Sequence, residues 1–173
     1  MATTTTAWLS DLTTLFTPTA SQFDGAKGHM DSIEARLGYV LGVHRMFDIG
    51  SLRHGTGVWQ YSDAVYVISL KGIQPTSPQT MLTKVKEALQ GRFTSTTITI
   101  RQPAVVCHFS DGVVEVVPGH VGAGGGYMIA NPTGGWMKSF SEERNKYVDE
   151  IRAEHRNGGA SKVVQHLTTW KYR

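Results

Sequence analysis

Cysteine is almost absent from this sequence: Cys107 is the only one in 173 residues, so an internal disulfide is excluded. Long apolar runs are missing too, and none approaches the ~20 residues that a membrane-spanning helix requires. The N-terminal segment MATTTTAWLSDL lacks the basic start and apolar core of a signal peptide. We therefore expect a cytoplasmic protein that spans no membrane and buries its one thiol within the apolar run AVVCHF.

A strong charge surplus is also missing. The net charge is +3 and the isoelectric point is about 9.1, which suits a phosphate-bearing ligand but falls short of a nucleic-acid-binding surface. The seven histidines show no zinc-binding spacing, and the stretch GHVGAGGGY lacks the Gly-Lys-Ser/Thr ending of a P-loop. The sequence therefore supports neither a zinc site nor a P-loop, and we expect residues 119–127 to form a flexible loop.

Helical and strand patterns are mixed along the chain. Apolar residues recur at helical spacing over residues 30–43, and Ser77-Pro78 and Gly91 mark the start and the stop of a second helix. Asp111-Gly112 predicts a hairpin turn between two strands. Segments rich in β-branched residues predict strands at 64–70, 96–100, 104–109 and 113–117.

Two further predicted helices close the chain. The first, over residues 139–155, begins with a capping box made by Ser139 and Glu142, and the second covers residues 160–173. With no internal repeat and one short sheet, residues 1–173 predict a single α+β domain in which residues 1–10 are flexible. The side chains that we expect the last three helices to bury are Met81, Leu82, Val85, Leu89, Tyr147, Val148, Ile151, Val163, Val164, Leu167 and Trp170.

The segment GSLRHGTGVWQYSDAVYVISL, which begins at residue 50, carries the chemistry that we expect. Its turn at Gly50-Ser51 can offer backbone N–H groups and a hydroxyl to phosphate oxygens, and Arg53 can add a positive charge. Asp63 precedes an apolar strand, and Glu115 is the one charged residue within the apolar strand VVEVV. Carboxylate oxygens are ligands that Mg²⁺ prefers. Taken alone, Glu115 also fits an outward-facing residue of an edge strand, and Arg53 fits a surface charge.

Three stretches, GSLRHGTGVWQYSD, VEVVP and TGGWMKSFSEERNKYV, resemble the bacterial cyclic-oligonucleotide synthases of antiphage defence. These cGAS-like nucleotidyltransferases (CD-NTases) are relatives of the oligoadenylate synthases. The resemblance implies the polymerase-β-like nucleotidyltransferase fold, with a mixed, mainly antiparallel sheet flanked by helices. It implies that Asp63 and Glu115 are catalytic residues that bind Mg²⁺ or Mn²⁺. It also implies that Ser51 contacts a nucleoside triphosphate or a nucleotide second messenger, and we expect Gly50, Arg53 and Thr56 of the same turn to contact it too.

Three departures from the family pattern bear on activity. Val65 stands where the family has its second metal-binding Asp, on the same strand face as Asp63. Thr168 or Thr169 stands where the family has a phosphate-binding Lys, and we expect the family's C-terminal helical domain to be absent. Asp111 is a neighbouring acid that could supply the missing carboxylate.

These observations leave three functions open. The first is a nucleotidyltransferase that uses Asp63, Glu115 and Mg²⁺ and is weakly active or inactive. The second is a degenerate relative without turnover, which binds a nucleotide or acts as a regulatory partner, as a homo-oligomer or paired with an active homologue. The third is a minimal nucleotidyltransferase of toxin–antitoxin type. The three departures favour the second function over the first.

Overall fold

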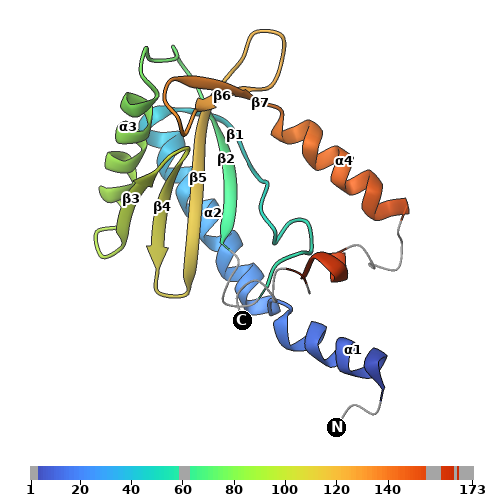
Figure 1. Ribbon diagram of the computed structural model, residues 1–173. Helices are drawn as coiled ribbons and strands as arrows, with labels where there is room; N and C mark the ends of the chain where they lie inside the picture. The colour runs from blue at the N-terminus through green and yellow to red at the C-terminus, as the bar shows by residue number, and fades with distance from the viewer. Residues whose placement is uncertain (1–3, 59–62, 155–160, 166, 168–173) are drawn as a thin grey trace.

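The computed structural model describes residues 4–58, 63–154, 161–165 and 167 (Figure 1). The described residues form an α+β fold with one seven-stranded sheet. Residues 161–165 and 167 are also helical. The helices are α1 (Thr5–Phe16), α2 (Ala20–Leu41), α3 (Pro78–Gln90) and α4 (Ser141–Glu154). The strands are β1 (Val43–Asp48), β2 (Ala64–Leu70), β3 (Thr97–Arg101), β4 (Ala104–Phe109), β5 (Gly112–Val121), β6 (Tyr127–Ala130) and β7 (Trp136–Ser139).

The sheet is mixed and mainly antiparallel, as the sequence predicts. Its strand order is β1-β2-β5-β4-β3, while β6 pairs with β5 and β7 pairs with β6. Only the central pair, β2 with β5, is parallel among the strand pairs of the described residues. This parallel pair places the N-terminal ends of two strands side by side at one end of the sheet.

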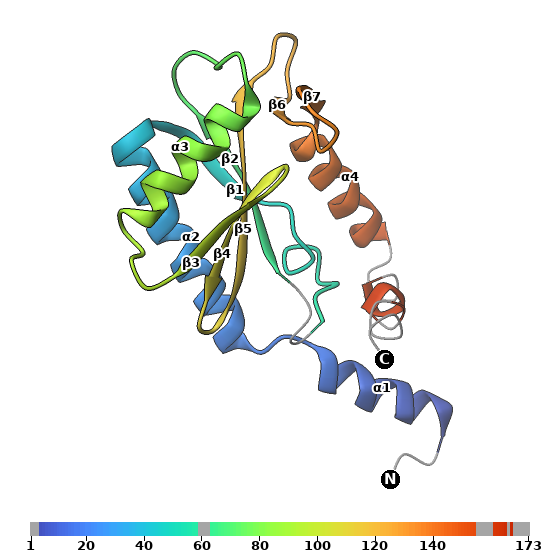
Figure 2. The same ribbon diagram turned by 60° about the vertical axis from the view of Figure 1, so that its left-hand side comes forward.

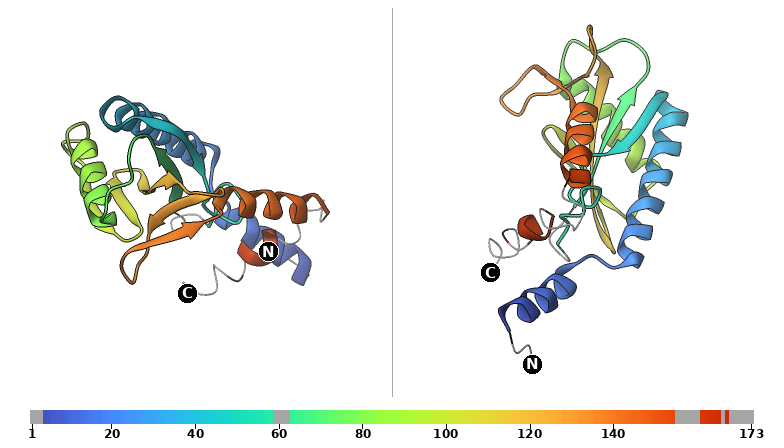
Figure 3. Two further views of the ribbon diagram at one scale, coloured as in Figure 1. Left: turned by 90° about the horizontal axis from the view of Figure 1, so that it is seen from above. Right: turned by 90° about the vertical axis from the view of Figure 1, so that its right-hand side faces the viewer.

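The two faces of the sheet are covered differently. Side chains that alternate along the strands, such as Tyr66 and Ile68 of β2, join the main core beneath α2 and α3. The opposite face holds a smaller cluster around Val67, Val117 and Tyr127. Helix α4 lies on this second side, across the sheet from α2 and α3 (Figures 2 and 3). The second face therefore carries a smaller apolar cluster than the first.

Strands β2 and β4 and helix α3 lie where the sequence predicts them. Ser77 caps α3 by accepting a hydrogen bond from the N–H of Gln79, with Pro78 in the first turn. The stripe that we expect α3 to bury is confirmed: Met81, Leu82, Val85 and Leu89. The thiol of Cys107 is buried in the main core, and burial raises its pKa to about 12.

The first predicted helix is wrong at both ends. Helix α2 begins at Ala20 rather than at residue 30, because Thr19 and Gln22 form a capping box ahead of it. It ends at Leu41 because Gly42, at φ +71°, leaves the helical region and leads into β1. The sequence analysis missed β1, which pairs with β2 in antiparallel register.

The predicted loop at residues 119–127 is also wrong at both ends. Strand β5 continues to Val121 and pairs with Tyr127 of β6, so the loop covers residues 122–126 only. The predicted hairpin between β4 and β5 is confirmed, with its turn one residue earlier than expected, at Ser110-Asp111. Three glycines at positive φ form the β5–β6 loop: Gly124, Gly125 and Gly126.

The C-terminal part of the sequence prediction needs the most correction. Helix α4 begins at Ser141, and Ser139 is the last residue of β7, so the predicted capping box of Ser139 and Glu142 is wrong. The side chain of Tyr147 is 63% exposed, because the buried side of α4 is formed by the polar residues Ser141 and Asn145. Three side chains expected to be buried after α4 are exposed: Val163, Val164 and Leu167. The expectations for Thr168, Thr169 and Trp170 fall outside the described residues.

The N-terminal helix α1 projects away from the sheet (Figure 1). Thr4 caps this helix by accepting a hydrogen bond from the N–H of Ala7. The helix includes residues 5–10, and the flexibility that we expect for residues 1–10 stays a prediction. Across the described part of the chain, no helix combines the length and the apolar character needed to cross a bilayer.

Candidate functional site

The turn that follows β1 packs against the start of β2. The N–H of Ile49 donates to the carbonyl of Val65 at 2.8 Å, which fixes the entry to the turn. Within the turn, the N–H of Thr56 donates to the carbonyl of Ser51 at 2.9 Å, and the hydroxyl of Thr56 reaches the same carbonyl at 3.4 Å. Gly50, Ser51 and Thr56 are thus brought together in one compact turn, as the resemblance implies.

Gly50 is needed where it is because the backbone of β2 passes very close. A Cβ atom added at Gly50 would lie 3.0 Å from the nitrogen of Val65 and 3.4 Å from its Cβ. The first distance is tighter than most real Cβ contacts and involves backbone, which cannot turn aside. The turn therefore lies directly beside position 65.

The carboxylate of Asp48 already uses one of the turn's donors. The N–H of Gly50 donates to Oδ1 of Asp48 at 2.7 Å. Burial raises the pKa of Asp48, while this hydrogen bond and the charge of Arg53 oppose the rise. A phosphate that binds the Gly50 N–H must displace this internal acceptor.

Asp63, Val65 and Glu115 lie in one row on the face opposite α2 and α3. Val65 of β2 is the Cα partner of Glu115 of β5, so the two side chains point to the same face. Asp63 precedes Val65 by two residues and shares its face. Of these three residues, Val65 lies beside the turn: its carbonyl accepts from the N–H of Ile49, and its backbone nitrogen lies close to Gly50. That the two acids face the turn stays a prediction.

Arg101, at the end of β3, contacts both carboxylates through the same nitrogen. Its Nη2 donates to Oε1 of Glu115 and lies 3.6 Å from Oδ2 of Asp63. The exposed fractions of the side chains are 64% for Arg101, 38% for Asp63 and 18% for Glu115. The two acids therefore converge, as the sequence predicts, but on a guanidinium group. Burial raises the pKa of Asp63, and the charges of Arg101 and His108 oppose that rise.

The donor set does not fit the pair of divalent ions that the resemblance implies. Two such ions are held about 3.5–4 Å apart by oxygen donors, with carboxylates completed by waters and substrate phosphates. No group of three or more His, Cys, Asp or Glu side chains in the described ranges could hold a metal ion. Val65, the neighbour of Glu115 across the parallel pair, has an apolar side chain and offers no oxygen. The metal-binding role of Asp63 and Glu115 stays a prediction.

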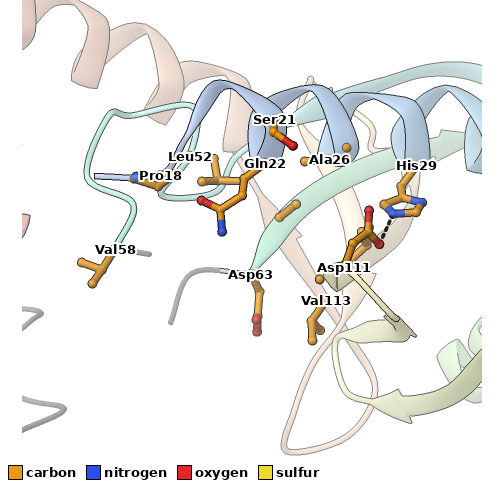
Figure 4. Close-up of a pocket in the computed structure, with 14 residues that line it drawn as sticks. Pro18, Ser21, Gln22, Ala26, His29, Leu52, Val58, Asp63, Asp111 and Val113 are labelled. Carbon is orange, nitrogen blue, oxygen red and sulfur yellow. Dashed lines mark hydrogen bonds and ion pairs between the residues drawn. The ribbon is translucent and has the colours of Figure 1, made fainter. Parts of the chain in front are cut away.

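Asp111 does not join the two acids. Its Oδ1 lies 2.8 Å from Nε2 of His29 on α2, and the ring of His29 stacks on Phe109 with the centroids 3.8 Å apart. Figure 4 shows Asp111 turned toward His29, whereas the side chain of Asp63 points away from α2. Both acids line a cavity of about 220 Å³ between the N-terminal half of α2, the turn and the start of β2.

Helix α4 also contacts the turn, through side chains that bind Asp48 and Arg53. The guanidinium of Arg53 pairs with Asp149 at 2.6 Å, and Arg152 donates to the carbonyl of Arg53 at 3.2 Å. The amide of Asn145 donates to the carbonyl of Asp48 at 2.9 Å. Arg53 therefore has an acidic partner within the chain, and its contact with phosphate stays a prediction.

The sequence analysis missed Arg101 as a residue of the site. The side chain of Arg101 lies on the same face of the sheet as that of Glu115. Side chains alternate along a strand, so Arg101 shares its face of β3 with Thr99. Thr99 pairs with Val106 of β4, and Val106 pairs with Glu115 of β5. The position of Arg101 therefore depends on two strand registers, and no local signal in the sequence gives both of them.

The fold and this row of residues define a nucleotidyltransferase-like domain. The family model described as "Second Messenger Oligonucleotide or Dinucleotide Synthetase domain" matches residues 4–151. The chain belongs to this family. A comparison with curated proteins found no match.

Solved structures of bacterial CD-NTases share the fold. A c-di-GMP synthase, CdnE from Capnocytophaga granulosa, matches with a TM-score of 0.74 and 13% identity over 96% of this chain and 57% of its own. CdnG from Bradyrhizobium diazoefficiens, solved in complex with GTP, matches with a TM-score of 0.72 and 15% identity over 82% and 45%. CdnC from E. coli MS115-1, solved in complex with HORMA-deltaN, matches with a TM-score of 0.72 and 16% identity. This match covers 95% of this chain and 55% of the CdnC chain. The chain thus spans about half the length of these structures.

The close approach at Gly50 predicts a stability effect. Gly50→Ala is expected to destabilise the protein by about 1–3 kcal/mol, because the new methyl group is pressed against the backbone of Val65. Gly28→Ala is the control: it lies in α2 with no atom within 4 Å of an added Cβ, and we expect it to stabilise by about 0.5–1 kcal/mol. Urea unfolding measures both, and equal effects would contradict the packing of the turn on β2.

Proposed function

We propose that this protein binds a nucleoside triphosphate at the Gly50-Ser51 turn and transfers nucleotides very slowly or not at all. The observation that carries the proposal is the register of β2 and β5, which puts Val65 between the turn and Glu115. The fold supplies the turn and two acids, while the middle position of the row lacks a carboxylate.

Nucleotide binding is supported by the family and by the turn. CdnG was solved with GTP, and a structure of CdnC from E. coli MS115-1 was solved with ATP, at 15% and 17% identity to this chain. Backbone N–H groups and the Ser51 hydroxyl are the donors that a turn of this kind offers to phosphate oxygens. Roles for the whole protein in cytoplasmic signalling and antiphage defence belong to the same proposal.

Weak turnover is supported by the chemistry of the row. Divalent ions supply charge stabilisation in nucleotidyl transfer that is worth several kcal/mol, and each ~1.4 kcal/mol is a factor of ten in rate. Asp63 and Glu115 share a contact with Arg101, and Val65 offers no oxygen. We therefore propose the degenerate alternative ahead of the active one, and the toxin–antitoxin type stays an untested alternative.

The first test concerns the turn. Ser51→Ala is expected to weaken ATP and GTP binding about 10-fold, because a hydrogen bond to a charged phosphate is lost. Isothermal titration calorimetry at up to millimolar nucleotide measures this. Ser110→Ala, at the exposed β4–β5 turn, is the matched control and should bind like the parent. No detectable binding by the parent protein would contradict the proposal.

The second test restores the missing acid. Val65→Asp is expected to tighten Mn²⁺ binding about 10-fold in the presence of ATP, because a third carboxylate joins the row. It should also lower the melting temperature of the metal-free protein, since like charges then crowd one site. Val121→Asp, at a strand position 62% exposed and at the other end of β5, is the control and should change neither quantity.

Turnover needs a separate assay. The unmodified protein is incubated with all four nucleoside triphosphates and Mg²⁺ or Mn²⁺, and the products are then separated. Rapid synthesis would contradict the proposal. Unchanged Mn²⁺ affinity in Val65→Asp would show that position 65 does not face the site.

Regulatory pairing is a second candidate, favoured by exposed apolar side chains on two helices. Trp8 and Leu15 of α1 are 52% and 63% exposed, and Tyr147 of α4 is 63% exposed. Burying such residues favours association. Sedimentation velocity is expected to show a dimer that Trp8→Ser with Leu15→Ser converts to monomer, while Ile73→Ser, at an exposed residue between β2 and α3, leaves it intact. A monomeric parent protein would contradict self-pairing.

A further inference from the structure

The contact of Arg101 with two acids reaches across four neighbouring strands of the sheet, from β3 to β2. Arg101 ends β3, Glu115 lies two strands away on β5, and Asp63 lies at the start of β2, one strand further. Neighbouring strands are about 4.8 Å apart, so only a long side chain can reach across β4 to the pair. Ala104, the β4 partner of Arg101, has a short side chain and is buried.

Arg101 offsets part of the negative charge on this part of the face. Asp63 and Glu115 carry two negative charges, and Arg101 carries one positive charge that is not lost in the physiological pH range. With Asp at position 65 the row would carry three negative charges and would attract divalent cations strongly. With Val65 it carries two, and one arginine offsets half of that charge.

We propose that Arg101 is the resident cation of this site: it holds Asp63 and Glu115 together where a divalent ion would otherwise bind, and it keeps such ions out. Arg101 donates a hydrogen bond to Glu115 and forms a longer ion pair, at 3.6 Å, with Asp63, so its positive charge lies between the two acids. A divalent cation that approaches the pair must break these contacts and accept a positive neighbour. This role does not require that the protein binds nucleotides.

The test is a Mn²⁺ titration without nucleotide, followed by the electron paramagnetic resonance signal of the free ion. Arg101→Gln is expected to bind Mn²⁺ at least about 10-fold more tightly than the parent protein, because one positive charge beside the ion is removed. Arg101→Lys keeps the charge and should remain close to the parent. Arg45→Gln is the matched control. Arg45 pairs with Glu142 at 2.9 Å, away from Asp63 and Glu115, so this variant also breaks an arginine–glutamate pair and removes one positive charge.

Two further measurements make the result decisive. Mn²⁺ should raise the melting temperature of Arg101→Gln and leave that of the parent unchanged. Adding Glu115→Gln to Arg101→Gln should abolish the tighter binding, because one of the two ligands is lost. Since the side chain of Arg101 is 64% exposed, its replacement should leave the far-ultraviolet circular dichroism spectrum unchanged.

Equal Mn²⁺ affinity in the parent and in Arg101→Gln would overturn the proposal. So would tighter binding that survives Glu115→Gln, because the ion would then lie elsewhere. A matching gain in Arg45→Gln would show a general effect of net charge and would also overturn it.

Discussion

The parallel pairing of β2 with β5 sets Val65 beside Glu115, and the other features of the site follow from that register. Alternation along β2 puts Asp63 on the same face, and the core beneath α2 and α3 fixes that face by burying Tyr66 and Ile68 on the other. A slip of one residue would exchange the two sets of side chains. The core that stabilises the fold therefore also positions the acids.

Around this row, the charged groups satisfy one another within the chain. Arg101 bridges the two acids, and Arg53 pairs with Asp149 of α4. The N–H of Gly50 is held by the carboxylate of Asp48. A ligand must compete with these contacts, so we expect binding to be weaker than the family fold alone suggests. The same contacts hold the turn in place, because α4 and β2 pack against it from two sides.

Local signals in the sequence were sufficient for β2, β4 and α3, where β-branched runs or a Ser-Pro cap act within a few residues. They were insufficient for β1, whose segment VHRMFD has no regular alternation of buried and exposed side chains and is defined by pairing with β2. Asp63 and Glu115 were predictable from residue type, since each is an acid in or beside an apolar strand. Arg101 was not, because its place depends on register across three strands.

The central claim is that this domain keeps the nucleotidyltransferase turn but holds an arginine between its two acids. A crystal structure of the protein soaked with ATP and Mn²⁺, with anomalous scattering recorded from manganese, tests it most directly. We predict triphosphate density at the Gly50-Ser51 turn, Arg101 still in contact with Asp63 and Glu115, and no anomalous peak between these two acids. Two manganese peaks coordinated by Asp63 and Glu115, with Arg101 displaced, would contradict the account.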